Sequence, residues 1–256
     1  MLASERRATL LALLRARGAT RIDTLANELR VSAMTVRRDV EVLVAEGVAE
    51  RVHGGVTAVG GRRPNDRLDA AISTRKAEKE AIADAALSLI EPGAVVGLSG
   101  GSSAWYLAKR LIEVPGLTVV TNSLSVVELF DDAVDGVDVI LTGGVRTPSR
   151  ALAGPVAVAS LAGLHCDITF LSVHGIHPEA GLTTPNILEA ETNRALAASA
   201  ARTAVLADHT KWQTVSLTTV VDLSQVDILI TDEGMAEADL IALRGLIPEV
   251  RVAHLR

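Results

Sequence analysis

Cysteine is nearly absent from this sequence, since Cys166 is the only one among 256 residues. A single cysteine excludes a disulfide within the chain and a cysteine cluster for zinc, and we expect a buried thiol. Aromatic residues make up 2%, which removes the stacking platforms that single-strand and RNA binders use. No apolar leader opens the chain and no stretch approaches eighteen apolar residues, so we expect a cytoplasmic protein.

Lysine is missing from residues 1–63, which carry eleven Arg against seven acidic residues and a net charge of +4. The remaining residues hold fourteen basic and twenty-four acidic groups, a net charge of −10. The length allows two domains, and a hydrophobic content of 48% can fill a core in each. A basic head on an acidic body suggests that contact with duplex DNA is confined to the head.

Three helices are predicted in the head, at residues 5–17, 22–29 and from 33 onward. The third has an apolar face of Val36, Val40, Leu43 and Val44, and Ser32 can cap it through its hydroxyl. The three-residue connection 30–32 has the length of a helix-turn-helix corner. Residues 48–53 and 56–59 then alternate around Gly54 and Gly55, which predicts a β-hairpin wing.

These residues predict a winged helix-turn-helix at 1–59, and they closely resemble the amino-terminal domain of the DeoR family of bacterial transcriptional regulators. The likeness rests on residues 5–7 (ERR), 32–39 (SAMTVRRD) and 51–55 (RVHGG). A small helical bundle with an incidental basic face is the alternative. On the DNA-binding interpretation, the third helix lies in a major groove. The contacts are then expected from Arg21, Ser32, Ala33, Thr35, Arg37, Arg38, Arg51 and His53.

Turn-forming and charged residues at 60–66 place a linker at 60–73, and the body extends over 74–256. There, short apolar runs alternate with helical patterns. Strands are predicted at 94–98, 117–121, 137–141, 167–172, 203–207, 227–231 and 250–254, and helices at 74–90, 103–112, 123–130, 155–164, 187–201 and 237–246. This alternation predicts an α/β domain with a mostly parallel sheet that helices cover on two sides.

Ligands of open α/β sheets bind beyond the carboxyl ends of the strands, so the residues after each strand are informative. Residues 99–103 (SGGSS) open a helix, and their amides and hydroxyls can hold a phosphate. A tight turn without ligand is the alternative. Polar residues after the other strands complete the set: Asn122, then Gly143, Gly144 and Arg146, then Glu189 and Glu191 on a helix, and residues 208–211. The set suits a phosphorylated polyol or sugar.

The body resembles the carboxy-terminal domain of the DeoR family, which looks like the sugar-phosphate isomerase fold. The resemblance implies an effector site that senses a sugar phosphate. It comprises Ser99, Gly100, Gly101, Ser102 and Ser103 around phosphate, Asn122, Gly143, Gly144 and Arg146 beside it, and Glu189, Asp208 and Lys211 near the sugar. Ser99 replaces the aspartate common in the family, so the effector's identity cannot be inferred from relatives.

Glu189, Asp208 and Lys211 are also residue types that an isomerase uses for proton transfer, so a sugar-phosphate isomerase-like enzyme is the competing function. A winged helix has no purpose in a free isomerase, and fold likeness does not confer chemistry. His165, His174, His177 and His209 form no metal pattern. We therefore expect a homodimeric or homotetrameric repressor of a carbohydrate operon, with no catalytic residues, metal or cofactor.

Overall fold

The structure is a computed structural model that describes residues 3–17, 20–52, 55–58, 68–130 and 137–255. The chain divides into two compact units, Met1–Asp69 and Ala70–Arg256. Each unit has its own hydrophobic core, and each is described by itself.

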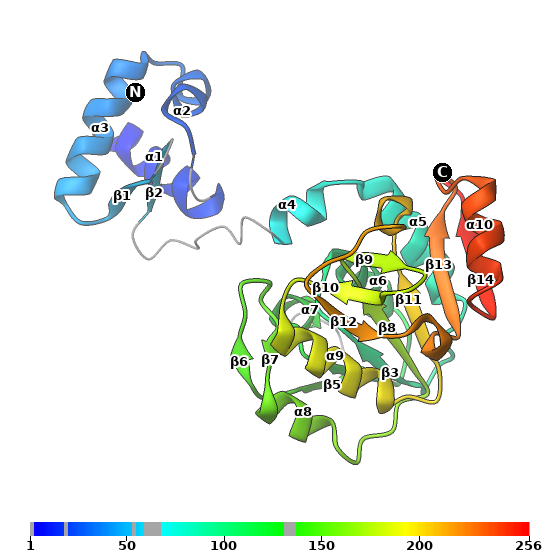
Figure 1. Ribbon diagram of the computed structural model, residues 1–256. Coiled ribbons are helices and arrows are strands. Elements are labelled where there is room, and N and C mark those ends of the chain that lie inside the picture. The colour runs from blue at the N-terminus through cyan, green and yellow to red at the C-terminus, as the bar shows by residue number, and fades with distance from the viewer. Residues whose placement is uncertain (1–2, 18–19, 53–54, 59–67, 131–136, 256) are drawn as a thin grey trace. The chain divides into compact units, whose positions relative to one another are not determined.

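The N-terminal unit consists of three helices followed by a β-hairpin (Figure 1). The helices are α1 (Ala3–Arg17), α2 (Ile22–Leu29) and α3 (Ala33–Ala45), and the antiparallel strands are β1 (Ala49–Val52) and β2 (Gly55–Ala58). The corner between α2 and α3 contains Arg30, whose left-handed backbone (φ 53°) lets its amide bond back to the end of α2. The predicted helix-turn-helix with a two-stranded wing is confirmed.

A buried ion pair joins the first and third helices of this unit. Arg6 Nε lies 2.5 Å from Asp39 Oδ2, and Arg6 Nη2 donates to Asp39 Oδ1 at 3.1 Å. Asp39 is only 5% exposed, and its hydrogen bond with Arg6 raises the pKa of that guanidinium. In the hydrophobic core of the same unit, Leu14, Leu25 and Val36 are fully buried. The orientation of α3 is thus fixed by apolar packing and by a two-point polar contact.

The C-terminal unit is built on a seven-stranded sheet with the order β14-β13-β11-β8-β3-β4-β5 (Figure 1). Every neighbouring pair is parallel. The strands are β3 (Val95–Leu98), β4 (Leu117–Thr121), β5 (Val137–Leu141), β8 (Ile168–Ser172), β11 (Thr203–Leu206), β13 (Ile228–Asp232) and β14 (Glu249–Ala253). The predicted α/β architecture with a mostly parallel sheet is therefore confirmed.

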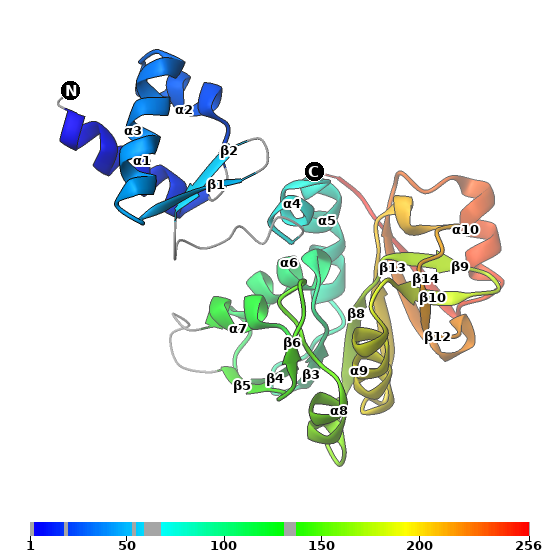
Figure 2. The same ribbon diagram turned by 60° about the vertical axis from the view of Figure 1, so that its left-hand side comes forward.

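Helices cover both faces of the sheet because successive strand residues enter two different cores. Phe170 of β8 packs with α5 (Lys76–Leu87), α6 (Ser102–Leu111) and α7 (Leu124–Phe130), whereas Leu171 packs with α8 (Pro155–Leu161), α9 (Ile187–Ala198) and α10 (Glu237–Arg244). Figure 2 shows α6 and α9 on opposite sides of β3 and β8. Alternation along a strand places each side chain on one face.

The segment before the sheet differs from the expected linker at 60–73. Residues 68–73 form the helix α4 (Leu68–Ser73), while 60–67 lie outside the described residues. Leu68 is buried and Ile72 packs against the core shared by α5 and α6. A segment of six residues gives too short a pattern to predict a helix.

Several short elements were also absent from the sequence prediction. The hairpin of β6 (Val145–Arg146) and β7 (Leu152–Ala153) follows β5, and β9 (Gly175–His177), β10 (Gly181–Thr184) and β12 (Thr218–Val221) form a separate antiparallel sheet. Two 3₁₀ turns, η1 (His209–Lys211) and η2 (Leu223–Gln225), complete the unit. Within the described residues, no helix is long and apolar enough to cross a membrane.

Candidate functional site

The polar face of α3 begins at a capped helix end. Ser32 Oγ accepts from the Thr35 amide at 3.1 Å and lies 2.8 Å from Thr35 Oγ1. Arg37 and Arg38 are exposed, whereas Ala33 is half-buried and packs against the core. The cap predicted for Ser32 is confirmed. The exposed surface of α3 therefore includes both arginines, together with Met34 and Glu41.

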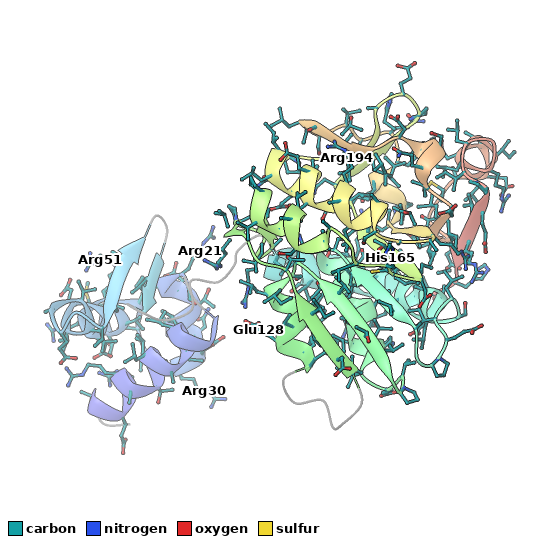
Figure 3. The ribbon with its side chains drawn as sticks, turned by 90° about the horizontal axis from the view of Figure 1, so that it is seen from below. Arg21, Arg30, Arg51, Glu128, His165 and Arg194 are labelled. Carbon is teal, nitrogen blue, oxygen red and sulfur yellow. The ribbon has the colours of Figure 1, made fainter. Side chains whose placement is uncertain are left out.

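Three arginines border a cleft of about 280 Å³ between α2, α3 and the wing. Arg21, Arg37 and Arg51 line it together with Asp23 and apolar residues. Arg51 Nη2 lies 3.2 Å from Glu41 Oε1, so the wing and α3 are linked by an exposed ion pair. Figure 3 labels Arg21 and Arg51 on the surface of this unit. His53, also predicted to contact DNA, lies outside the described residues.

In the C-terminal unit, the predicted polar segments follow parallel strands at their carboxyl ends. Residues 99–103 follow β3, Asn122 follows β4, Gly143 and Gly144 follow β5, and Asp208 follows the end of β11. Because all these strands run in one direction, the segments share one edge of the sheet. Their hydrogen bonds divide them into two groups.

The first group surrounds residues 99–103 and is held by side chains from two neighbouring strands. The Gly100 amide donates to Asn122 Oδ1 at 3.0 Å. The Ser172 amide donates to Ser99 Oγ at 2.8 Å, and Ser172 Oγ accepts from the Ala104 amide at 2.9 Å. Asn122 and Ser99 are fully buried. These contacts fix the turn between β3 and α6 without using its central amides.

The path of this turn depends on the backbone conformation of Gly101. Its backbone has φ 132° and ψ 163°, a combination that only glycine adopts readily. A Cβ there would lie 2.5 Å from Ser172 Cβ, so the backbone approaches β8 too closely for any side chain. Among the described residues, the amides of Gly101, Ser102 and Ser103 have no hydrogen-bond partner. Free amides at a helix N-terminus bind anions.

A chain of contacts leads from this turn to Glu189. Asn122 Nδ2 donates to Leu152 O at 3.1 Å, and the Leu152 amide returns a bond to Asn122 O at 2.7 Å. In the same hairpin, Ser149 Oγ donates to Glu189 Oε1 at 2.5 Å. The structure thereby connects Gly100, Asn122 and Glu189, which are far apart in sequence.

The segment after β5 uses its glycines for packing. The Gly143 amide donates to Ser160 Oγ at 3.3 Å. At Gly144 (φ 128°) an added Cβ would lie 2.7 Å from Ala153 O. Arg146 is exposed in β6, and no ion pair to it occurs in the described part of the chain. Of the three residues predicted here, Arg146 alone presents a group that an anion could use.

The second group gathers charges around Asp208. This carboxylate is 2% exposed and caps η1 by accepting from the Thr210 amide at 3.1 Å and from Thr210 Oγ1. Arg75 Nε lies 3.8 Å from Asp208 Oδ1. Burial lowers the pKa of Lys79, an effect that Asp208 opposes and Lys211 reinforces. Asp208 therefore lies near the cations Arg75, Lys79 and Lys211, and no hydrogen bond or ion pair among the described residues ties it to the glycine turn.

Sequence reasoning missed Ser172, Ser149, Arg75 and Lys79. Ser172 is the last residue of β8, and the rule applied to the other strand ends would have found it. Lys79 gave no signal because its position in α5 is that of an ordinary polar helix residue. The ring of His209, in η1, is held by Asp232 through Nδ1 and Oδ2 at 2.7 Å. No cluster suited to a metal ion occurs among the described residues.

Two family models match the chain and together cover most of it. Residues 6–60 match the DeoR-like helix-turn-helix domain, and residues 74–233 match the DeoR C terminal sensor domain. The chain is 35% identical over 219 residues to the HTH-type transcriptional regulator GolR of Listeria innocua, covering 85% of each chain. It is 31% identical over 229 residues to the HTH-type transcriptional repressor CsqR of Escherichia coli, covering 88% of this chain and 85% of the relative.

A third relative, the L-fucose operon activator of Haemophilus influenzae, is 31% identical over 225 residues, 86% of this chain and 88% of its own. Among solved structures, ribose 5-phosphate isomerase A of Methanocaldococcus jannaschii has a TM-score of 0.40 and 17% identity over 55% of each chain. Fold likeness of this strength assigns no chemistry.

Proposed function

Since the chain belongs to the DeoR family of transcriptional regulators, we propose that it represses a carbohydrate operon and that a phosphorylated sugar relieves this repression. The N-terminal unit binds duplex operator DNA, and the C-terminal unit binds the effector. The observation that carries the effector assignment is the set of three unpaired amides at Gly101, Ser102 and Ser103.

Binding of DNA by the N-terminal unit is supported by where its charges lie. Arg37 and Arg38 are exposed on the first turns of α3, and Arg21 and Arg51 flank the adjoining cleft. In this class of domain the second helix of the motif enters the major groove, and arginines there bond to guanine or phosphate. Asp39 faces inward to Arg6 and therefore does not repel phosphate from the contacting face.

Binding of a phosphate ester is supported by the geometry of the turn after β3. The free amides point out of the first turn of α6, where the helix dipole favours negative charge. Ser99, Asn122 and Ser172 already pair with the surrounding groups, so the first amides of α6 are left for an anion. Arg146 and Lys211 are the cations proposed to neutralise phosphate, and Glu189 and Asp208 are proposed to bind hydroxyl groups.

The sign of regulation and the assembly are parts of the same proposal. Relatives of the chain include a repressor and an activator. Release of a repressor by a catabolic intermediate is the arrangement we propose, with a coupling of about 1–3 kcal/mol between effector and DNA. A single winged helix of this size makes few base contacts, so we propose at least a dimer that reads two half-sites. Sedimentation of a monomer bound tightly to one half-site at physiological salt would contradict this.

Catalysis is not part of the proposal. Glu189 already accepts a hydrogen bond from Ser149, and Asp208 is engaged by Thr210 and lies near Arg75. Both carboxylates are placed to hold groups rather than to carry protons. A turnover assay with pentose and hexose phosphates should show no isomerisation above the uncatalysed rate.

The effector site is tested by an isosteric pair of variants at Ser102. Ser102→Asp places a carboxylate at the first position of α6, which a helix tolerates well but which repels phosphate. Ser102→Asn has nearly the same shape and no charge. In a thermal-shift screen of sugar phosphates, the asparagine variant should keep the stabilisation of the wild type, while the aspartate variant should lose it. Equal stabilisation of both variants would place the effector elsewhere.

A further inference from the structure

The C-terminal end of α4 is held by two buried side chains from different helices. Tyr106 Oη donates to Ile72 O at 3.0 Å. Lys79 Nζ donates to Ala71 O at 2.5 Å and also to Thr74 O. Tyr106 and Lys79 are 3% and 4% exposed. Two carbonyls that the end of this short helix leaves unpaired, and the carbonyl of Thr74 just after it, are thus paired with side chains.

Each of these two side chains is also connected to one of the two groups of residues in the candidate effector site. Tyr106 lies in α6, one turn after Ser102, at whose amide the helix begins. Lys79 lies in the field of Asp208 and Lys211, the two residues of the segment after β11 that were predicted to contact the sugar. A helix is stiff over a single turn, so a displacement of its first residues moves Tyr106 as well.

Arg75 strengthens the second connection. It stands between α4 and α5 with a left-handed backbone (φ 52°), a conformation that a residue other than glycine keeps only when its surroundings impose it. Its guanidinium lies 3.8 Å from Asp208 Oδ1 and 3.5 Å from His209 Nε2. A hydroxyl group bound to Asp208 would compete with Arg75 for this carboxylate.

We infer that Tyr106 and Lys79 are positioning residues that transmit occupancy of the effector site to α4, the helix through which the chain continues toward the DNA-binding unit. An anion at the amides of α6 acts through Tyr106, and a hydroxyl at Asp208 acts through Arg75 and Lys79. Both act on one helix end. The inference rests on the proposed function and names residues that the effector itself does not touch.

If these contacts only stabilised α4, the expected results would differ from those of transmission. Loss of a cap on α4 would then lower stability and leave the response of DNA binding to effector unchanged. Transmission requires instead that effector binding persist while its effect on DNA binding falls. The two roles are separated by measuring both affinities in the same variant.

The variant Tyr106→Phe removes the hydroxyl and keeps the buried ring. Its control is Ser88→Ala, which removes an exposed hydroxyl that donates to Ala85 O at 2.8 Å and accepts from Arg251 Nη1 at 2.9 Å. Lys79→Met is compared with Lys76→Met, since Lys76 is exposed on the same helix and pairs only with Glu80 at 3.6 Å among its described contacts. Ribose 5-phosphate, glucose 6-phosphate and inorganic phosphate serve as probes, with an operator duplex selected by the full-length protein from a random pool.

In the wild type, a phosphate ester that binds in calorimetry should change the operator Kd by about 5- to 150-fold. Tyr106→Phe and Lys79→Met should bind that ester within about threefold of wild type and lose most of the change in operator Kd, while both controls keep it. A full response in Tyr106→Phe and Lys79→Met overturns the inference and leaves the effector site standing.

If none of the three probes binds the wild type, the proposal of a sugar-phosphate effector is refuted. The link from Tyr106 and Lys79 through α4 to DNA binding is then tested on the unliganded protein. Hydrogen exchange of residues 68–74 should then be faster in Tyr106→Phe and Lys79→Met than in the controls, with operator Kd altered as well. Faster exchange with unchanged operator Kd would show that these contacts only cap α4 and would overturn the inference.

Discussion

Replacement of Gly101 by alanine should destabilise the C-terminal unit far more than a glycine-to-alanine change elsewhere. The added Cβ would lie 2.5 Å from Ser172 Cβ, and both atoms are attached directly to backbone. Neither can rotate away, so β8 or the turn must move. Movement of Ser172 would in turn break the bond from the Ala104 amide.

Two costs add in this variant. A residue with a Cβ in the glycine-only region of φ and ψ costs about 1–3 kcal/mol. Overpacking of a close contact costs about 1–3 kcal/mol more. We therefore expect a loss of about 2–6 kcal/mol from a total stability of about 5–15 kcal/mol. Gly163→Ala is the matched control, since Gly163 also has a positive φ of 82° but no atom within 4 Å of the added Cβ, so its loss should be about 1–2 kcal/mol.

Urea unfolding, monitored by tryptophan fluorescence, measures this difference because the signal reports on the C-terminal unit. Trp105 and Trp212 are the two tryptophans of the chain, and both lie in the C-terminal unit. Equal midpoints and slopes for Gly101→Ala and Gly163→Ala would refute the close approach of the turn to β8. The loss of stability also makes Gly101 a poor position for testing effector binding, for which Ser102 is better suited.

Three further outcomes are expected. Arg38→Ala should weaken operator binding by about 1–3 kcal/mol if Arg38 reads a base and by less if it contacts phosphate, which a salt titration separates. Asn122→Ala leaves the Gly100 amide without its acceptor and should cost about 1–3 kcal/mol in urea unfolding. Burial raises the pKa of the Cys166 thiol, so a thiol reagent should label it only after unfolding. The protonated, buried thiol contributes stability that is fully present below the pKa of the thiol in the unfolded chain. This stability is lost as pH rises through the pKa of the thiol in the folded protein.

The architecture of both units was predictable because the spacing of apolar residues along the sequence indicates which residues are buried. The apolar faces of α2 and α3 and the apolar runs of β4 and β8 indicate which sides of these elements pack against a core. The confirmed capping by Ser32 belongs to the same class, since it depends only on neighbours in sequence. Elements without a periodic apolar signal, such as α4 and the hairpin of β6 and β7, were not predictable in this way.

The candidate site was predictable only in outline. A rule about strand ends indicated the segments, and it required no knowledge of their partners. Whether a segment is open to a ligand depends on bonds to residues far away in sequence, such as Gly100 to Asn122 and Ser149 to Glu189. The role of Lys79 depends on the fold, because one of the carbonyls it contacts, Ala71 O, belongs to a helix that the sequence does not signal.

Two pairs of glycines illustrate why composition alone could not separate a binding turn from a packing turn. Gly100–Gly101 and Gly143–Gly144 follow parallel strands in the same way, and each pair contains a residue with positive φ. Gly144 uses that freedom to pack against Ala153, and the amide of Gly143 is taken up by Ser160. Gly101 uses it to start a helix whose first amides are left without acceptors. The first amides of any helix lack partners within it, so this turn, which its neighbours hold in place, leaves three amides for the acceptor that we propose comes from outside the chain.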